Sequence, residues 1–199
     1  MTLAGPDKPA GEPTTTAVPE PRRRVFRRLT FGGRLAAFAW RWAQRSLFYL
    51  SPTPANTWRR VLLRCFGARV DRSARIDPSV RIIHPWNLTL CPGAVVCHNV
   101  ILDCQAPITL GAHTRISQFS HLCTATHSYS RRDMPIVGRP IVIGDRCWLA
   151  ADVYVGCGVK IADGVVVGAR ASVFKDVPAD TIVVGNPAKA QQVRDTASA

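Results

Sequence analysis

Residues 143–177 read IGDRCWLAADVYVGCGVKIADGVVVGARASVFKDV, and this stretch has a period of six. Steps of six from Ile143 reach only aliphatic residues: Leu149, Val155, Ile161, Val167 and Val173. A second series from Cys147 reaches only small or β-branched residues: Val153, Val159, Val165, Ala171 and Val177. A helix repeats every 3.6 residues and a single strand every two, so neither explains this pattern. A hexapeptide period predicts a parallel β-helix, in which short strands stack coil on coil.

The same phase continues upstream in three blocks, residues 70–82, 90–102 and 110–122. The step between blocks lengthens to eight residues after Ile82 and after Leu102, and to twenty-one after Leu122. A pair of extra residues can loop out at a corner without disturbing the stack. The long insertion must leave the coil altogether, and such excursions often carry function.

The expected organisation is one domain with tails. Residues 1–21 are rich in proline and threonine and predict a disordered tail. Residues 22–66 form a basic and aromatic helical segment, residues 67–185 the all-β domain with a loop at 123–142, and residues 186–199 a C-terminal tail. Seven cysteines without a CxxC pair indicate reduced thiols, and therefore a cytoplasmic protein without a disulfide framework.

The formal net charge is +13, and much of the excess lies in residues 22–64, interleaved with aromatic residues. Nucleic-acid binding is disfavoured, because no recognised nucleic-acid motif accompanies the charge. A helix over about residues 33–50 could lie on an anionic membrane, whereas Arg41 and Arg45 argue against a membrane-spanning segment. A second helix is expected at about 56–66. The plainer interpretation is a cap over the open first coil, which is compatible with membrane contact.

His127 is the candidate catalytic residue, since it lies where the hexads stop and the insertion begins. An imidazole titrates near neutral pH and can move a proton, although a single histidine is more often a structural hydrogen-bonding group. Zinc enzymes with a parallel β-helix use three histidines. The spacing of His113, His121 and His127 does not match that pattern, so no metal is expected.

Four segments resemble the hexapeptide-repeat acyltransferases, a family that includes galactoside, maltose and nodulation-factor O-acetyltransferases. They are PIVIGDRCWLA from Pro140, GVKIADG from Gly158, VGARASVFKDVP from Val167 and GNPAK from Gly185. The PWNL sequence from Pro85 and the region of His127 are similar to the colanic acid biosynthesis acetyltransferases. The resemblance implies a left-handed coil, assembled as a homotrimer with active sites between subunits, in addition to the N-terminal helical cap expected above.

The resemblance also implies roles for individual residues. His127 would be the general base that takes a proton from a sugar hydroxyl as the oxygen attacks acetyl-CoA. Asn99 would contact the acceptor. The remaining matches are cofactor-binding: Trp148 beside the pantetheine arm, Ala151 and Ala169 through their backbones, and Lys175 near the nucleotide phosphates.

The expected function is therefore acetyl-CoA-dependent O-acetylation of a sugar hydroxyl, in a surface polysaccharide or its lipid-linked precursor. Residues 22–60 would provide peripheral contact with the inner face of the cell membrane or with the lipid-linked saccharide. Two alternatives remain open. One is an acyltransferase for another small hydroxyl or amine acceptor, and the other is a zinc-containing or non-catalytic β-helix scaffold.

Overall fold

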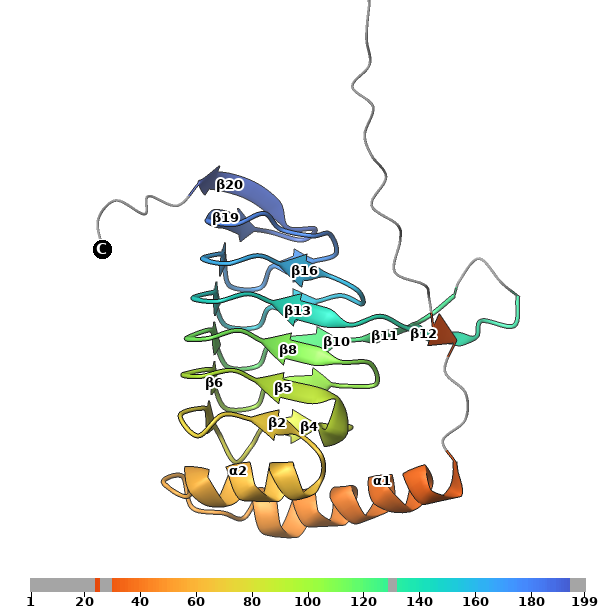
Figure 1. Cartoon of the computed structure of the whole chain (residues 1–199). Coiled ribbons are helices and arrows are strands. Elements are labelled where there is room, and N and C mark those ends of the chain that lie inside the picture. The colour runs from red at the N-terminus through yellow and green to blue at the C-terminus, as the bar shows by residue number, and fades with distance from the viewer. Residues whose placement is uncertain (1–23, 26–29, 129–131, 194–199) are drawn as a thin grey trace, which may run out of the picture.

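The computed structural model describes residues 24–25, 30–128 and 132–193. Within these residues, a column of stacked strands rises above two helices (Figure 1). The predicted disordered tail at residues 1–21 lies outside the described residues. The hexapeptide period is confirmed as a parallel β-helix, while the left-handed sense of the coil rests on the family resemblance.

Three sheets form the faces of the column, and each is named here after its first strand. The β2 sheet contains β2 (Arg69–Val70), β5 (Leu88–Leu90), β8 (Ile108–Leu110), β13 (Ile141–Ile143) and β16 (Lys160–Ile161). The β3 sheet contains β3 (Arg75–Ile76), β6 (Val95–Val96), β9 (Arg115–Ile116), β14 (Trp148–Leu149), β17 (Val166–Val167), β19 (Thr181–Val184) and β20 (Lys189–Val193). The β4 sheet contains β4 (Arg81–Ile82), β7 (Ile101–Asp103), β10 (His121–Cys123), β15 (Tyr154–Val155) and β18 (Ser172–Val173).

The residues of the six-residue series point inward and form the core. Ile143, Leu149, Val155, Ile161 and Val167 are each at most 2% exposed, and their strand neighbours are the outward residues. Alternation along a strand places adjacent side chains on opposite faces, so a two-residue strand supplies one core residue and one surface residue. Four further residues form the turn to the next strand, as between Ile143 and Trp148, so core positions recur every six residues.

All variation in coil length occurs at one edge of the column. Val70, Leu90, Leu110, Ile143 and Ile161 stack on one another, so successive coils span 20, 20, 33 and 18 residues. An edge here is the turn between two sheets. The first edge joins the β2 and β3 sheets, and the second edge joins the β3 and β4 sheets. Across each of these two edges, the step from one core residue to the next is always six residues. The third edge, from the β4 sheet to the next coil, absorbs the extra residues.

The longest third-edge connection is a β-hairpin. The sequence predicted a loop at 123–142, whereas the structure has β11 (Ala125–His127) paired antiparallel with β12 (Ile136–Gly138). The short strand β1 (Arg24–Val25) pairs with the other side of β12. Figure 1 shows this hairpin projecting sideways from the column. We call residues 124–140 the excursion.

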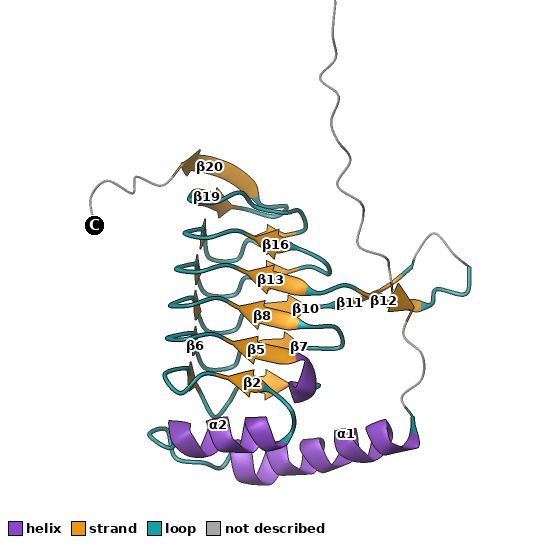
Figure 2. Cartoon of the chain, in the orientation of Figure 1, coloured by secondary structure: helices purple, strands orange, loops and turns teal. Residues whose placement is uncertain are grey.

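Two helices and a π-helical turn cover the first coil, as Figure 2 shows in purple at the base. They are α1 (Phe31–Ala43), the turn η1 (Gln44–Phe48) and α2 (Asn56–Cys65); a 3₁₀ turn, η2 (Pro85–Asn87), lies at the third edge. Trp40, Phe48 and Leu63 are fully buried under the coil. The expected cap is therefore present.

The cap donates hydrogen bonds to the first coil through its side chains. In the inner coils, backbone carbonyl groups accept hydrogen bonds from N–H groups of the preceding coil, as Leu90 does from Asp71. The first coil has no preceding coil to supply these donors. Five carbonyls of the first coil accept from cap side chains instead: Val70 from Arg64, Ala74 from Arg60, Ile76 from Arg59, Val80 from Gln44 and Ile82 from Trp40. The cap thus satisfies polar groups that burial would otherwise leave unpaired.

The last coil ends in a strand rather than in a tail. The sequence assigned residues 186–199 to a C-terminal tail, but β20 pairs antiparallel with β19 and extends the β3 sheet to Val193. Residues 194–199 lie outside the described residues. All seven cysteines are free thiols. Among the described residues, no helix is long and apolar enough to cross a membrane.

Candidate functional site

His127 is exposed at the end of β11, in the excursion that leaves the third edge. Its Nδ1 atom lies 2.6 Å from the backbone carbonyl oxygen of Met134, on the other side of the hairpin. The pairing of β11 with β12 brings these two residues together, with His127 in register with Ile136. The hairpin therefore fixes the orientation of the imidazole ring.

This hydrogen bond also determines the tautomer of His127. A carbonyl oxygen can only accept, so Nδ1 carries the proton and donates it to Met134. In the neutral ring the proton-accepting lone pair is then on Nε2. A histidine held in this way can act as a general base toward a hydroxyl group that approaches Nε2.

Three of the predicted site residues lie along the second edge. Asn99 is exposed in the second coil, Ala151 lies in the fourth coil, and Ala169 is exposed in the fifth. The corner positions Asn99, Asp152 and Arg170 all have φ close to 60°, so the turns have the same geometry from coil to coil. The carbonyl oxygen of Ala151 accepts a 2.9 Å hydrogen bond from the N–H of Arg170, which joins the fourth and fifth turns.

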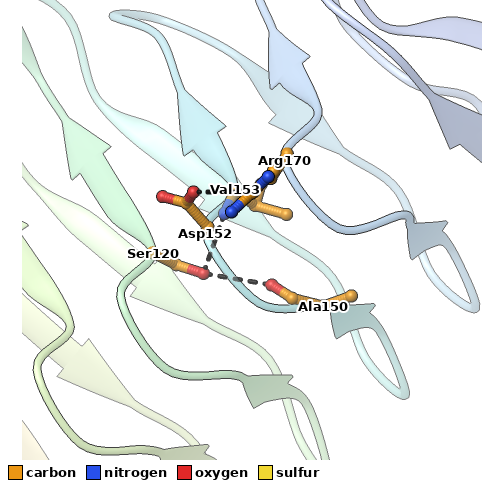
Figure 3. A network of polar contacts seen from close by, with 5 residues as sticks. All are labelled: Ser120, Ala150, Asp152, Val153 and Arg170. Carbon is orange, nitrogen blue, oxygen red and sulfur yellow. Dashed lines mark hydrogen bonds and ion pairs between the residues drawn. The ribbon is translucent and has the colours of Figure 1, made fainter.

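A buried hydroxyl group holds the turn that contains Ala151. Figure 3 shows Ser120 between Ala150 and Val153, and Arg170 beside Asp152. The hydroxyl of Ser120 donates to the carbonyl of Ala150 at 3.1 Å and accepts from the N–H of Val153 at 3.2 Å. The ion pair between Arg170 and Asp152 is exposed to solvent and adds little. The backbone of this turn is thus rigidly presented.

Trp148 and Lys175 lie away from those turns. Trp148 is on the outer face of β14, half exposed, and its indole N–H donates to the hydroxyl of Ser117 at 3.0 Å. Lys175 is exposed just after β18, at the third edge of the fifth coil. The four predicted cofactor-binding residues are therefore spread around the fourth and fifth coils. Of all the predicted site residues, only Asn99, Ala151 and Ala169 lie along the same edge.

The structure does not bring His127 onto the edge that carries Asn99, Ala151 and Ala169. His127 leaves from the third edge, and the β4 sheet lies between the two edges. In one chain the proposed base and the second-edge residues therefore belong to different sides of the column.

One polar cluster was missed by the sequence reasoning. The ligand atoms of Asp103, His121 and Cys123 all lie within 4.8 Å of one another on the β4 sheet. In the sequence, His121 was weighed as a ligand only together with His113 and His127, and Cys123 counted only as one of seven reduced thiols. The available signal was the coil length, because Asp103 and Cys123 are 20 residues apart and stack directly.

A groove of about 1090 Å³ separates α1 from the first coil. Its walls combine apolar and basic side chains: Phe31, Leu35, Ala37 and Phe38 with Arg34, Arg41, Arg45 and Arg81. Among the described residues, none that line this groove is acidic. Ile83 and His84, where the third edge of the first coil begins, also line the groove.

Comparison with known proteins identifies the class. The family model for the bacterial transferase hexapeptide (six repeats) matches residues 140–175. A relative, the putative colanic acid biosynthesis acetyltransferase WcaF of Escherichia coli K12, is 47% identical over 157 residues, which cover 79% of this chain and 86% of that protein. The chain therefore belongs to the hexapeptide-repeat acetyltransferases and is an acyltransferase. Within that family it is related to WcaF.

Solved structures agree with this assignment. The hexapeptide-repeat acetyltransferase VCA0836 of Vibrio cholerae, complexed with acetyl coenzyme A, is 28% identical, with a TM-score of 0.73, over 83% of this chain and 91% of that one. A galactoside acetyltransferase in complex with coenzyme A has a TM-score of 0.77 over 84% of this chain and 85% of that one. At 22% identity the second match supports the fold alone.

Proposed function

We propose that this chain transfers the acetyl group of acetyl-CoA to a sugar hydroxyl of a surface polysaccharide or its lipid-linked precursor, with His127 as general base. The observation that carries the proposal is the hydrogen bond from Nδ1 of His127 to Met134, which leaves Nε2 as the proton acceptor on an exposed hairpin. The relationship to WcaF and the likeness to an acetyltransferase complexed with acetyl coenzyme A support the reaction class.

The mechanism follows from the hydrogen-bonding capacity of His127. Nε2 removes the hydroxyl proton as the sugar oxygen forms its bond to the acetyl carbonyl carbon. The resulting imidazolium keeps its Nδ1–H bond to Met134, which orients the ring and stabilises its positive charge. When the carbon–sulfur bond breaks, the same proton passes to the leaving thiolate. Backbone N–H groups would stabilise the oxyanion of the tetrahedral intermediate.

We assign the coenzyme to the second edge and the upper coils. Ala151 and Ala169 would hydrogen-bond the pantetheine arm through their backbones, Trp148 would pack beside it, and the cation of Lys175 would face the phosphates. Asn99 would contact the acceptor. This arrangement requires a homotrimer, which we propose as well, because a second copy would have to bring its second edge next to His127, which one chain alone does not.

The groove beside α1 supports a lipid-linked acceptor. A polyprenyl-type lipid carrier joins an apolar chain to an anionic phosphate, and the groove offers apolar walls with four arginines. The exposed stripe of Phe31, Leu35, Phe38 and Trp42 along α1, of which the first three also line the groove, would lie in the membrane interface. Residues 22–60 would thus hold the enzyme at the cytoplasmic face of the membrane, where acetyl-CoA is available.

The test of the proposed base is acetyl transfer by His127→Ala and by a matched control, His113→Asn. His113 is also exposed but lies at the first edge, with a φ of 57° that asparagine tolerates. We expect His127→Ala to lower kcat by about 10²–10⁴-fold, with coenzyme A binding unchanged, and His113→Asn to retain activity. Full activity of His127→Ala on a competent saccharide acceptor would refute the assignment.

A further inference from the structure

The cluster of Asp103, His121 and Cys123 lies on the outer face of the β4 sheet, where the excursion begins. Leu102 and Leu122 point into the core, so their strand neighbours point outward. β7 and β10 pair in parallel with Cys123 opposite Asp103 and His121 opposite Ile101. Two adjacent coils therefore bring a carboxylate, an imidazole and a thiol together by backbone pairing.

The distances suit a small cation. All three ligand atoms lie within 4.8 Å of one another, and Sγ of Cys123 is 3.7 Å from Oδ2 of Asp103. In a tetrahedral zinc site, bonds of about 2.0–2.3 Å place neighbouring ligand atoms about 3.3–3.7 Å apart. The sulfur–oxygen pair already has this separation, and the nearer imidazole nitrogen lies within 4.8 Å of both atoms.

One atom of the cluster has no partner. Oδ1 of Asp103 is buried and, in the described part of the chain, accepts no hydrogen bond. A buried carboxylate oxygen without a partner is costly, and such groups in native structures usually point to an ion or a bound water. The other oxygen, Oδ2, lies 3.7 Å from Sγ of Cys123, whose single thiol proton can be donated either there or to the carbonyl oxygen of Ala125 at 3.2 Å.

Burial affects two of the donors in opposite ways, since it favours the neutral imidazole of His121 and disfavours the thiolate of Cys123. Burial lowers the pKa of His121, against the opposing effect of Asp103. Burial also raises the pKa of the Cys123 thiol. The ring of Tyr154 packs edge-on against His121 and shields the cluster from one side.

We propose that Asp103, His121 and Cys123 bind a divalent transition-metal ion, with zinc favoured by the mixed oxygen, nitrogen and sulfur donors. The thiol loses its proton to solvent on binding, and water completes the coordination. This departs from the sequence expectation that no metal is present. The ion would tie the second coil to the third at the base of the excursion, and so hold the hairpin that carries His127.

The test is titration of the full-length, chelator-treated protein with Co²⁺, a spectroscopic probe for tetrahedral zinc sites. We expect a near-ultraviolet thiolate-to-cobalt absorption band that Zn²⁺ abolishes by competition. Cys123→Ser should lose this band, and Asp103→Asn and His121→Gln should each weaken Co²⁺ binding by at least tenfold, because even supporting residues around a metal cost 10–100-fold. The matched controls Cys97→Ser and His113→Asn should bind like the wild type.

Absence of the band in the wild type, or equal loss in Cys97→Ser and Cys123→Ser, would overturn the proposal. Asp103→Asn is nearly isosteric, so it keeps the test decisive if Cys123→Ser does not fold; unchanged Co²⁺ affinity in this variant would also overturn it. The readout is separate from acetyl transfer. His127→Ala should bind Co²⁺ normally, so failure of the catalytic assignment and failure of the metal site give different results.

Discussion

The two helices of the cap are both rich in arginine, yet they use it in opposite ways. In α2, Arg59, Arg60 and Arg64 point to the first coil and donate to its carbonyl groups. Along α1 and η1, Arg34, Arg41 and Arg45 line an open groove beside exposed aromatic side chains. The comparison teaches that the role of a basic residue depends on what stands opposite it. The arginines of α2 complete the fold, and those of α1 and η1 are available to an anionic ligand.

The largest effect is expected at Arg59. Its guanidinium group is 1% exposed and donates to Ile76, Ser51, Pro52 and Thr53. Arg59→Met removes these four bonds and should lower the free energy of unfolding by about 4 kcal/mol, at roughly 1 kcal/mol each. The matched variant Arg45→Met in η1 should change it by less than about 0.5 kcal/mol. Urea unfolding measures the free energy of unfolding of both variants. Equal losses would contradict the different roles assigned to the arginines of α2 and η1.

The second prediction concerns the groove. Replacing Arg34, Arg41 and Arg45 by glutamine should weaken binding to vesicles of phosphatidylglycerol and phosphatidylcholine. At about 1 kcal/mol per residue near an anionic surface, the loss is about 100-fold. The thermal midpoint of the variant should match the wild type. Cosedimentation with vesicles measures the binding, and undiminished binding would show that α1 does not provide the membrane contact.

A third prediction sharpens the comparison within α1 itself. The indole N–H of Trp40 donates to the buried carbonyl of Ile82 at 2.7 Å, whereas Trp42 is 63% exposed. Trp40→Phe should lower the free energy of unfolding by about 2 kcal/mol, because the carbonyl of Ile82 loses its donor. Trp42→Phe should leave stability unchanged. Chemical denaturation measures the free energy of unfolding of both variants. A larger loss for Trp42→Phe than for Trp40→Phe would contradict this account.

The smallest expected effect is on the pH dependence of stability, and it arises at Asp71, near Arg64 of α2. Asp71 accepts hydrogen bonds from the backbone and hydroxyl of Ser73, which lower the pKa of its carboxyl group, and Arg64 of α2 adds to this. Because the folded-state pKa lies below the ordinary value of about 3.9, the stabilisation is complete above that pH and is lost as pH falls through the folded-state pKa. Asp71→Asn should therefore flatten the acid limb of stability against pH. An unchanged limb would show that Asp71 is not responsible.

The core and the position of the excursion could be predicted from the sequence, because core positions recur with a fixed period. Leu149 and Val155 are core residues for the same reason as Ile143, and the break after Leu122 marks a departure from the column. The orientation of His127 could not be predicted, since Met134 reaches it only across a hairpin.

Pairings between coils were harder to predict than the period within a coil. Asp103 and Cys123 meet because their coil is 20 residues long, and this length includes two residues that the six-residue period does not count. Arg59 and Arg45 look alike in the sequence, because nothing local shows which of them faces a carbonyl. β20 was missed for a related reason: it runs antiparallel and carries no hexapeptide signal.

The side-chain donors of the cap also bear on how the protein avoids fibril formation. A stack of parallel coils has an open end that can recruit another stack, as the growing end of an amyloid fibre does. Here five carbonyl groups already accept from indole, amide and guanidinium donors and are not free to pair with a second molecule: those of Val70, Ala74, Ile76, Val80 and Ile82. Removal of α1 and α2 would turn that end into a template for end-to-end polymerisation.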